Sequence, residues 1–112
     1  MNAYEVIRSY LSQAELLAQL AEEAAELSKA ALKFRRVCDG TNPTPVTYDE
    51  ALGNIKEEIA DVKLLLSILG LDSNYMEISM IQAEKLVRWI DRLNKSGGKD
   101  NGTKETNQPP RA

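Results

Sequence analysis

Two short acidic clusters hold the residues of this chain that are best suited to chemistry. They are Glu22-Glu23-Ala-Ala-Glu26 and Glu57-Glu58-Ile-Ala-Asp61. Because each residue of an α-helix turns by about 100°, Glu23 and Glu58 fall within the apolar arcs of their segments. Three residues later, Glu26 lies on the flank of its arc and Asp61 falls between Leu65 and Ile68, whereas the first glutamate of each cluster points further outward. Each segment therefore presents a pair of carboxylates at the edge of its packing face.

Carboxylates in such positions need a partner, because burial of an isolated carboxylate is costly and normally drives its protonation. Four converging carboxylates repel one another unless a cation neutralises them, and a set of oxygen ligands suits Mg²⁺ better than zinc or iron. A cation between these four carboxylates would therefore be Mg²⁺, with Mn²⁺ as an alternative ion. Acidic pairs at this spacing are also common on solvated helix faces, so an ordinary surface role stays open.

Composition restricts the chemistry further. The 112 residues make up one domain's length and include no His, which removes His general bases, His metal ligands and the Glu-x-x-His motif of di-iron bundles. Cys38 is the single cysteine, so neither an intrachain disulfide nor a Cys-based zinc site is expected. The formal net charge of −3 argues against a general nucleic-acid binder.

Nothing in the sequence points to a membrane. No apolar run approaches the ~20 residues that are needed to cross a bilayer. The first residues, Met-Asn-Ala-Tyr-Glu, do not form the basic and then apolar pattern of a signal peptide. We therefore expect a cytoplasmic protein without a membrane partner.

Helical periodicity runs through most of the chain and positions the acidic clusters. It predicts a short helix over residues 4–11 and long helices over 13–37, 48–69 and 73–95. Gly40 and the two prolines of residues 42–45 break the pattern, and Thr47 with Glu50 forms a capping box for the third helix. Gly70 ends that helix, and Asp72 or Ser73 is expected to cap the fourth.

These elements predict an all-α fold, an antiparallel four-helix bundle-like domain over residues 1–95. Residues 96–112 contain no Val, Ile, Leu, Met or aromatic residue, and we expect a disordered polar tail there. A domain of this size buries only a thin core, and the third and fourth helices carry apolar residues on more than one face. We therefore expect a homodimer or homotetramer.

The paired clusters resemble the signature of the all-α nucleotide pyrophosphohydrolases, the MazG-like group. The resemblance covers roughly residues 13–93 and includes the context Leu-Ala-Glu-Glu-Ala-Ala-Glu-Leu, the Asn42-Pro-Thr-Pro45 connection, Glu57-Glu58-Ile-Ala-Asp61-Val and Lys85-Leu-Val-Arg88-Trp89. The 31 residues between Glu26 and Glu58 are more than many members have, which puts the substrate class in doubt.

The resemblance implies hydrolysis of a nucleoside triphosphate between its α and β phosphates, which yields a monophosphate and pyrophosphate. It further implies that the Mg²⁺ ligands are Glu23, Glu26, Glu58 and Asp61. Glu22 would be a supporting ligand or a base that orients the attacking water. The sequence contains no Gly-x-x-x-x-Gly-Lys-Ser/Thr loop, so a P-loop enzyme is not expected.

A basic stripe on the fourth helix offers groups that could hold the triphosphate. Lys85 and Arg88 also match the family-like segment, and we predict that they bind phosphate. The alternative is a solvated stripe favoured by the helix C-terminus. A different class of function is also open, namely a non-catalytic helical module for self-association or partner binding. The presence of all four carboxylates favours the enzyme.

Overall fold

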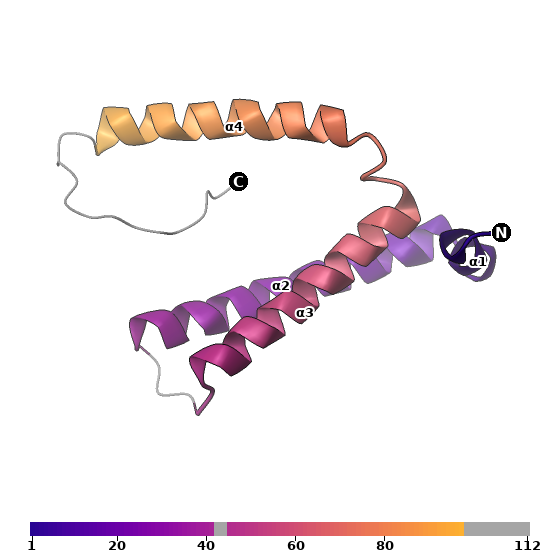
Figure 1. The fold of residues 1–112 in the computed structure, drawn as a ribbon, viewed down its shortest axis with the longest axis horizontal. Helices are drawn as coiled ribbons and strands as arrows, with labels where there is room; N and C mark the ends of the chain where they lie inside the picture. Colours follow the sequence, from indigo (N-terminus) through magenta and orange to yellow (C-terminus); the bar gives the residue numbers. More distant parts are fainter. Residues whose placement is uncertain (42–44, 98–112) are drawn as a thin grey trace. The chain divides into compact units, whose positions relative to one another are not determined.

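Four helices make up the part of the chain that the computed structural model describes, residues 1–41 and 45–97 (Figure 1). They are α1 (Ala3–Tyr10), α2 (Gln13–Asp39), α3 (Tyr48–Leu69) and α4 (Tyr75–Ser96). No strand occurs among the described residues, which confirms the all-α prediction. The chain divides into two compact units, Met1–Ser73 and Asn74–Ala112.

Local capping explains where the helices of the first unit begin and end. Ser12 precedes α2 and accepts a hydrogen bond from the Glu15 N–H, while the Glu15 carboxylate accepts one from the Ser12 N–H. Thr47 and Glu50 form the predicted box in the same way at α3. The backbone turns to positive φ at Gly40 and Gly70, where α2 and α3 end, as helix C-termini commonly do.

The cap of the fourth helix differs from the prediction. Asn74, not Asp72 or Ser73, precedes α4, and its side-chain oxygen accepts from the Glu77 N–H at 3.2 Å. The side chains of both predicted caps form other hydrogen bonds in the turn after α3. Asp72 accepts a hydrogen bond from the Ser67 hydroxyl at 2.7 Å, and the Ser73 hydroxyl donates to the Gly70 carbonyl at 2.8 Å. The prediction was therefore wrong because local bonds to α3 compete for these side chains.

In the first unit, α2 and α3 lie side by side as an antiparallel pair (Figure 1). Leu16 of α2 is buried against Leu65 and Ile68 of α3, and further leucines pack around this cluster. Helix α1 also contacts α3, and the Arg8 guanidinium donates to the Ile68 carbonyl at 2.7 Å. This small core fixes the register of the two long helices. The acidic clusters lie between the core and the other end of the helix pair, where α2 ends and α3 begins.

At that far end, the rings of Phe34 and Tyr48 meet edge to face, with centroids 5.2 Å apart. This contact joins the last turns of α2 to the first residue of α3. The aromatic pair and the leucine cluster therefore secure the two helices on both sides of the acidic residues.

The remaining predictions about the fold concern the connection after α2, the C-terminal tail, the end of α4 and the assembly of the helices. The expected connection with two prolines falls mostly on residues 42–44, and the polar tail falls mostly on residues 98–112; both lie outside the described residues. Helix α4 includes Ser96, one residue past the predicted boundary at 95. Among the described helices, none has both the length and the apolarity that crossing a membrane requires. The four-helix bundle and its oligomerisation stay predictions.

Replacing Thr47 by Ala should lower the free energy of unfolding by about 1 kcal/mol, because the Glu50 N–H loses its acceptor at the start of α3. Urea unfolding followed by circular dichroism measures this change. Thr47→Ser, which keeps the hydroxyl, is the control and should cost far less. An equal loss in both variants would show that the methyl group matters instead of the cap.

Candidate metal centre

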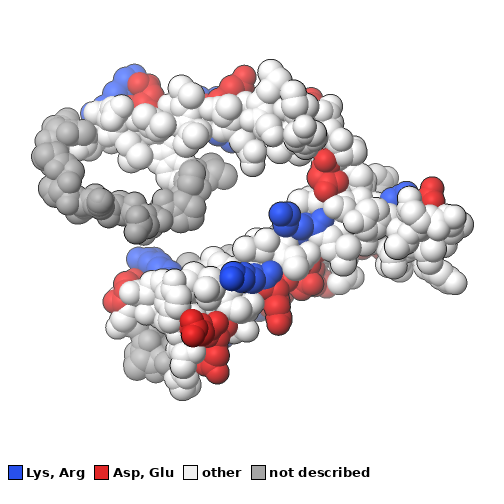
Figure 2. Space-filling model, in the orientation of Figure 1, with Lys and Arg blue, Asp and Glu red and all other residues white. Residues whose placement is uncertain are grey.

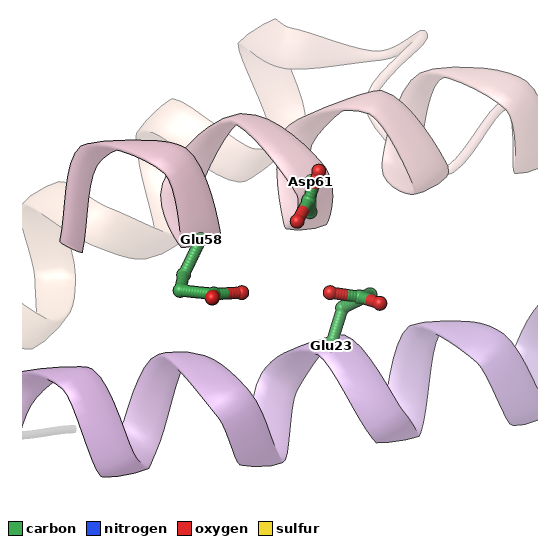
Figure 3. A group of neighbouring side chains, drawn as sticks. All are labelled: Glu23, Glu58 and Asp61. Carbon is green, nitrogen blue, oxygen red and sulfur yellow. The ribbon is translucent and has the colours of Figure 1, made fainter. Parts of the chain in front are cut away.

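Three of the predicted ligands come together between α2 and α3. Glu23 projects from α2 toward Glu58 and Asp61, which project from successive turns of α3 (Figure 3). One carboxylate oxygen from each residue lies within 4.8 Å of the other two. These three residues are called here the carboxylate triad. Glu23 precedes Glu58 by 35 residues in the sequence and Asp61 by 38.

The helix period explains why two members of the triad are half-buried. Glu23 follows the buried Leu16 by seven residues, which is close to two turns, and so it shares the face of α2 that packs on α3. Glu58 lies seven residues after Ala51 and seven before Leu65, both of which are buried. Asp61 is rotated toward the flank and is exposed. The triad therefore has two members in the helix interface and one at its edge.

The triad is electrostatically strained. Burial, followed by the charges of Asp61 and Glu58, raises the pKa of Glu23 above its ordinary value. Burial also raises the pKa of Glu58, with further contributions from Asp61, Glu26 and Glu57. Both groups are therefore protonated more readily than an exposed glutamate, as expected where carboxylates lie close together without a cation.

Glu58 carries the most informative atom of the site. Its Oε1 atom is shielded from solvent and has no hydrogen-bond partner among the described residues. A buried acceptor of this kind costs free energy, and native proteins rarely tolerate one without a compensating group. A cation between the triad carboxylates would provide that compensation.

Glu26, the fourth predicted ligand, lies outside the triad. Its carboxylate forms an ion pair with the Lys29 ammonium at 3.6 Å, and half of the Glu26 side chain is exposed. It is nevertheless close enough to Glu58 to raise the pKa of that residue. A rotation of the Glu26 side chain away from Lys29 would be needed before it could join the triad, and its role as a ligand stays a prediction.

The other predicted site residues lie on exposed positions. Glu22 and Glu57 are exposed on α2 and α3, in agreement with their outward positions on the helical wheel. Lys85 and Arg88 are exposed on α4, in the second compact unit. The structure does not assign a role to any of these four residues, and their functions stay predictions.

Gln19 is a residue that the sequence argument did not single out. It lies one turn before Glu23 on α2, and its side chain lowers the pKa of Glu23, opposing the effects of burial and of the neighbouring carboxylates. The spacing of four residues between an amide and a carboxylate on one helix is the signal that could have identified it.

The donor set of the triad fits a hard divalent cation. All three groups are carboxylates, and neither sulfur nor imidazole takes part. Oxygens on opposite sides of one Mg²⁺ lie about 4 Å apart, since each bond is about 2.1 Å long. The triad oxygens lie within 4.8 Å of one another, so a small inward movement of the side chains would let them share one ion. Exposed acidic groups also gather in proteins without binding a metal, so the buried Glu58 oxygen is the observation that favours an ion here.

The sequence matches no family model, and comparisons with curated proteins and with solved structures also give no match. A functional interpretation of the triad therefore depends on its residues and their geometry.

Proposed function

We propose that this protein is a magnesium-dependent nucleotide pyrophosphohydrolase, which hydrolyses a ribo- or deoxyribonucleoside triphosphate to the monophosphate and pyrophosphate. The observation that supports this proposal is the convergence of Glu23, Glu58 and Asp61, with one buried oxygen of Glu58 lacking a partner. The same carboxylates form the paired motif that resembles the MazG-like group. A triphosphate is itself a polyanion, so three carboxylates would repel it unless cations lie between them.

The roles of the residues follow from their positions. Glu23, Glu58 and Asp61 would hold Mg²⁺, and Glu26 would complete the set after leaving Lys29. When bound, Mg²⁺ neutralises phosphate charge and lowers the pKa of a coordinated water. Glu22 would orient the attacking water or accept its proton, because the chain offers no His for that task.

Hydrolysis then needs one water and one broken bond. The water oxygen attacks the α-phosphorus, and the bond from this phosphorus to the oxygen bridging it to the β-phosphate breaks. Pyrophosphate leaves with the bridging oxygen, and the proton of the water passes to a carboxylate before its release to solvent. That Lys85 and Arg88 bind phosphate, Arg88 through paired hydrogen bonds, stays a prediction.

An assay of the full chain with common ribo- and deoxyribonucleoside triphosphates tests the proposal. We expect pyrophosphate and the monophosphate as products in the presence of Mg²⁺, and no turnover when a chelator removes the metal. Release of orthophosphate with a diphosphate would show cleavage between the β and γ phosphates and would contradict the proposal. Absence of products with every nucleotide would leave the non-catalytic helical module.

A further inference from the structure

Lys29 contacts the one predicted metal ligand that stands outside the triad. Its ammonium lies 3.6 Å from the carboxylate of Glu26, three residues earlier on α2. The same carboxylate is close enough to Glu58 to raise the pKa of that residue. Glu26 therefore lies between a cation that the chain itself supplies and the place where a second cation would bind.

This contact has no counterpart at the other predicted ligands. Figure 2 shows acidic and basic side chains interspersed on the visible face of α2 and α3. Among the described residues of these two helices, ion pairs form only between Lys29 and Glu26 and between Arg35 and Asp39. Lys29 is therefore the basic side chain of the helix pair that is placed to compete with a metal for a ligand.

Glu26 cannot serve both cations fully at once. To join the triad, its side chain must turn toward Glu58 and lengthen a contact with Lys29 that is already 3.6 Å long. Two cations beside one carboxylate also repel each other. The Lys29 side chain is 75% exposed, and exposed ion pairs contribute little to stability, so a divalent cation can displace the ammonium easily.

The displaced ammonium would lie beside a centre that holds a triphosphate. Lys29 follows Glu23 by six residues, which corresponds to about 9 Å along the helix axis. Side chains of a helix lean toward its N-terminus, and the flexible four-carbon stem of lysine lets the ammonium follow an anion. With the carboxylates bound to metal, the anion that remains there is a non-bridging phosphate oxygen of the nucleotide.

We propose that Lys29 exchanges its partner when the site is loaded. It pairs with Glu26 in the metal-free protein, and it binds a phosphate oxygen once Glu26 has turned to the metal. Toward the metal Lys29 is a positioning residue, which acts through Glu26 and opposes metal binding, whereas it favours binding of the nucleotide. This inference rests on the proposed function and names a further phosphate-binding residue of the same site.

Calorimetric titration of the full chain with Mg²⁺, without nucleotide, tests the first half of the exchange. Lys29→Met removes the ammonium and keeps the apolar stem, and it should lower the Kd of Mg²⁺ by about two- to fivefold, the range that an exposed ion pair allows. Lys33→Met is the matched control. It removes the same charge one turn further along α2, where the described residues form no ion pair with Lys33, and the Kd should change much less.

A double-mutant cycle shows whether the effect passes through Glu26. In the Glu26→Gln background, Lys29→Met should leave the Kd of Mg²⁺ unchanged, because the carboxylate for which the two cations compete is absent. The same decrease in both backgrounds would mean that Lys29 acts only through its charge, and it would overturn the proposal. Equal effects of Lys29→Met and Lys33→Met, or weaker Mg²⁺ binding in Lys29→Met, would overturn it as well.

Steady-state kinetics at saturating Mg²⁺ tests the second half. Lys29→Met should raise the KM for the nucleotide about tenfold and change kcat far less, because a contact to a phosphate oxygen that persists through the reaction contributes to binding in general. Lys29→Arg keeps the charge and should restore most of the lost affinity. An unchanged KM in Lys29→Met would contradict the phosphate contact.

Failure of this inference can be distinguished from failure of the proposed function. Absence of Mg²⁺ binding or of pyrophosphate release in the unmodified protein would overturn the function and the inference together. Magnesium-dependent turnover in which neither the Kd of Mg²⁺ nor the KM responds to Lys29→Met would overturn the inference alone. Circular dichroism verifies that each variant keeps its helical content.

Discussion

Replacement of Glu58 by Gln should reduce magnesium-dependent pyrophosphate release by at least about 100-fold, while the helical content is unchanged. Gln keeps the size of the side chain and removes its charge, so the cation loses a ligand with little change in packing. The Glu58 Oε1 atom is the buried triad oxygen without a hydrogen-bond partner, and we expect it to depend most on the metal. Steady-state kinetics at saturating Mg²⁺ measures the effect.

Glu57→Gln is the matched control for this variant. Glu57 precedes Glu58 directly but is exposed, and it is not a member of the carboxylate triad. We expect turnover within a few-fold of the unmodified protein. A strong loss at Glu57 with none at Glu58 would move the ligand assignment by one residue. Near-normal turnover in both variants would show that the triad is not the catalytic centre.

Stability should depend on pH in opposite ways with and without Mg²⁺. In the metal-free protein, burial and neighbouring carboxylates raise the pKa of Glu23 and Glu58. The folded state therefore binds protons more readily than the unfolded chain, and stability should increase as the pH falls from about 7 toward the ordinary glutamate pKa near 4.5. Thermal unfolding at a series of pH values, without metal, should show this rise.

The rise should stop at lower pH. Hydrogen bonds from Ser12 and from Thr41 lower the pKa of Glu15 and Asp39, respectively, and protonation of those groups removes stabilising contacts. Their contribution is present above the ordinary carboxylate pKa and is lost as the pH falls below it. A maximum in stability near the ordinary glutamate pKa of 4.5 is the expected result for the metal-free protein.

Magnesium should reverse the trend between about pH 7 and pH 5. Metal binding requires ionised carboxylates and stabilises the folded state that binds it, so the increase in unfolding temperature with Mg²⁺ should be largest at pH 7 and shrink toward pH 5. In Glu58→Gln both the metal-induced increase and the metal-free rise should be smaller. The same metal-induced increase in Glu58→Gln and in the unmodified protein would place the cation elsewhere.

Local features of this protein could be predicted from its sequence because they depend on few neighbours. A capping box needs only Thr47 and Glu50, and a left-handed helix end needs only a glycine such as Gly40 or Gly70. The half-buried positions of Glu23 and Glu58 follow from the helix period and from the apolar residues around them. In each case the interacting groups lie within two helical turns of one another.

Tertiary structure decided which carboxylates meet. The sequence treated Glu26 and Asp61 alike, since each follows a glutamate of the apolar arc by three residues. Only Asp61 joins the triad, because the packing of α2 on α3 brings Glu23 opposite the turns that carry Glu58 and Asp61. The relative register of two helices depends on contacts between residues far apart in the chain, such as Leu16 with Leu65, and helical periodicity within either segment contains no information about it.

The start of α4 shows the same division at shorter range. Asp72, Ser73 and Asn74 are all good N-cap residues, so composition alone could not select one of them. Hydrogen bonds of Asp72 to Ser67 and of Ser73 to Gly70 engage the first two, and Asn74 is left to cap the helix. The helices, their glycine ends and the faces that carry carboxylates could therefore be predicted from the sequence. The choice of N-cap and the convergence of the triad oxygens depend on distances between residues of different elements, so only the tertiary structure shows them.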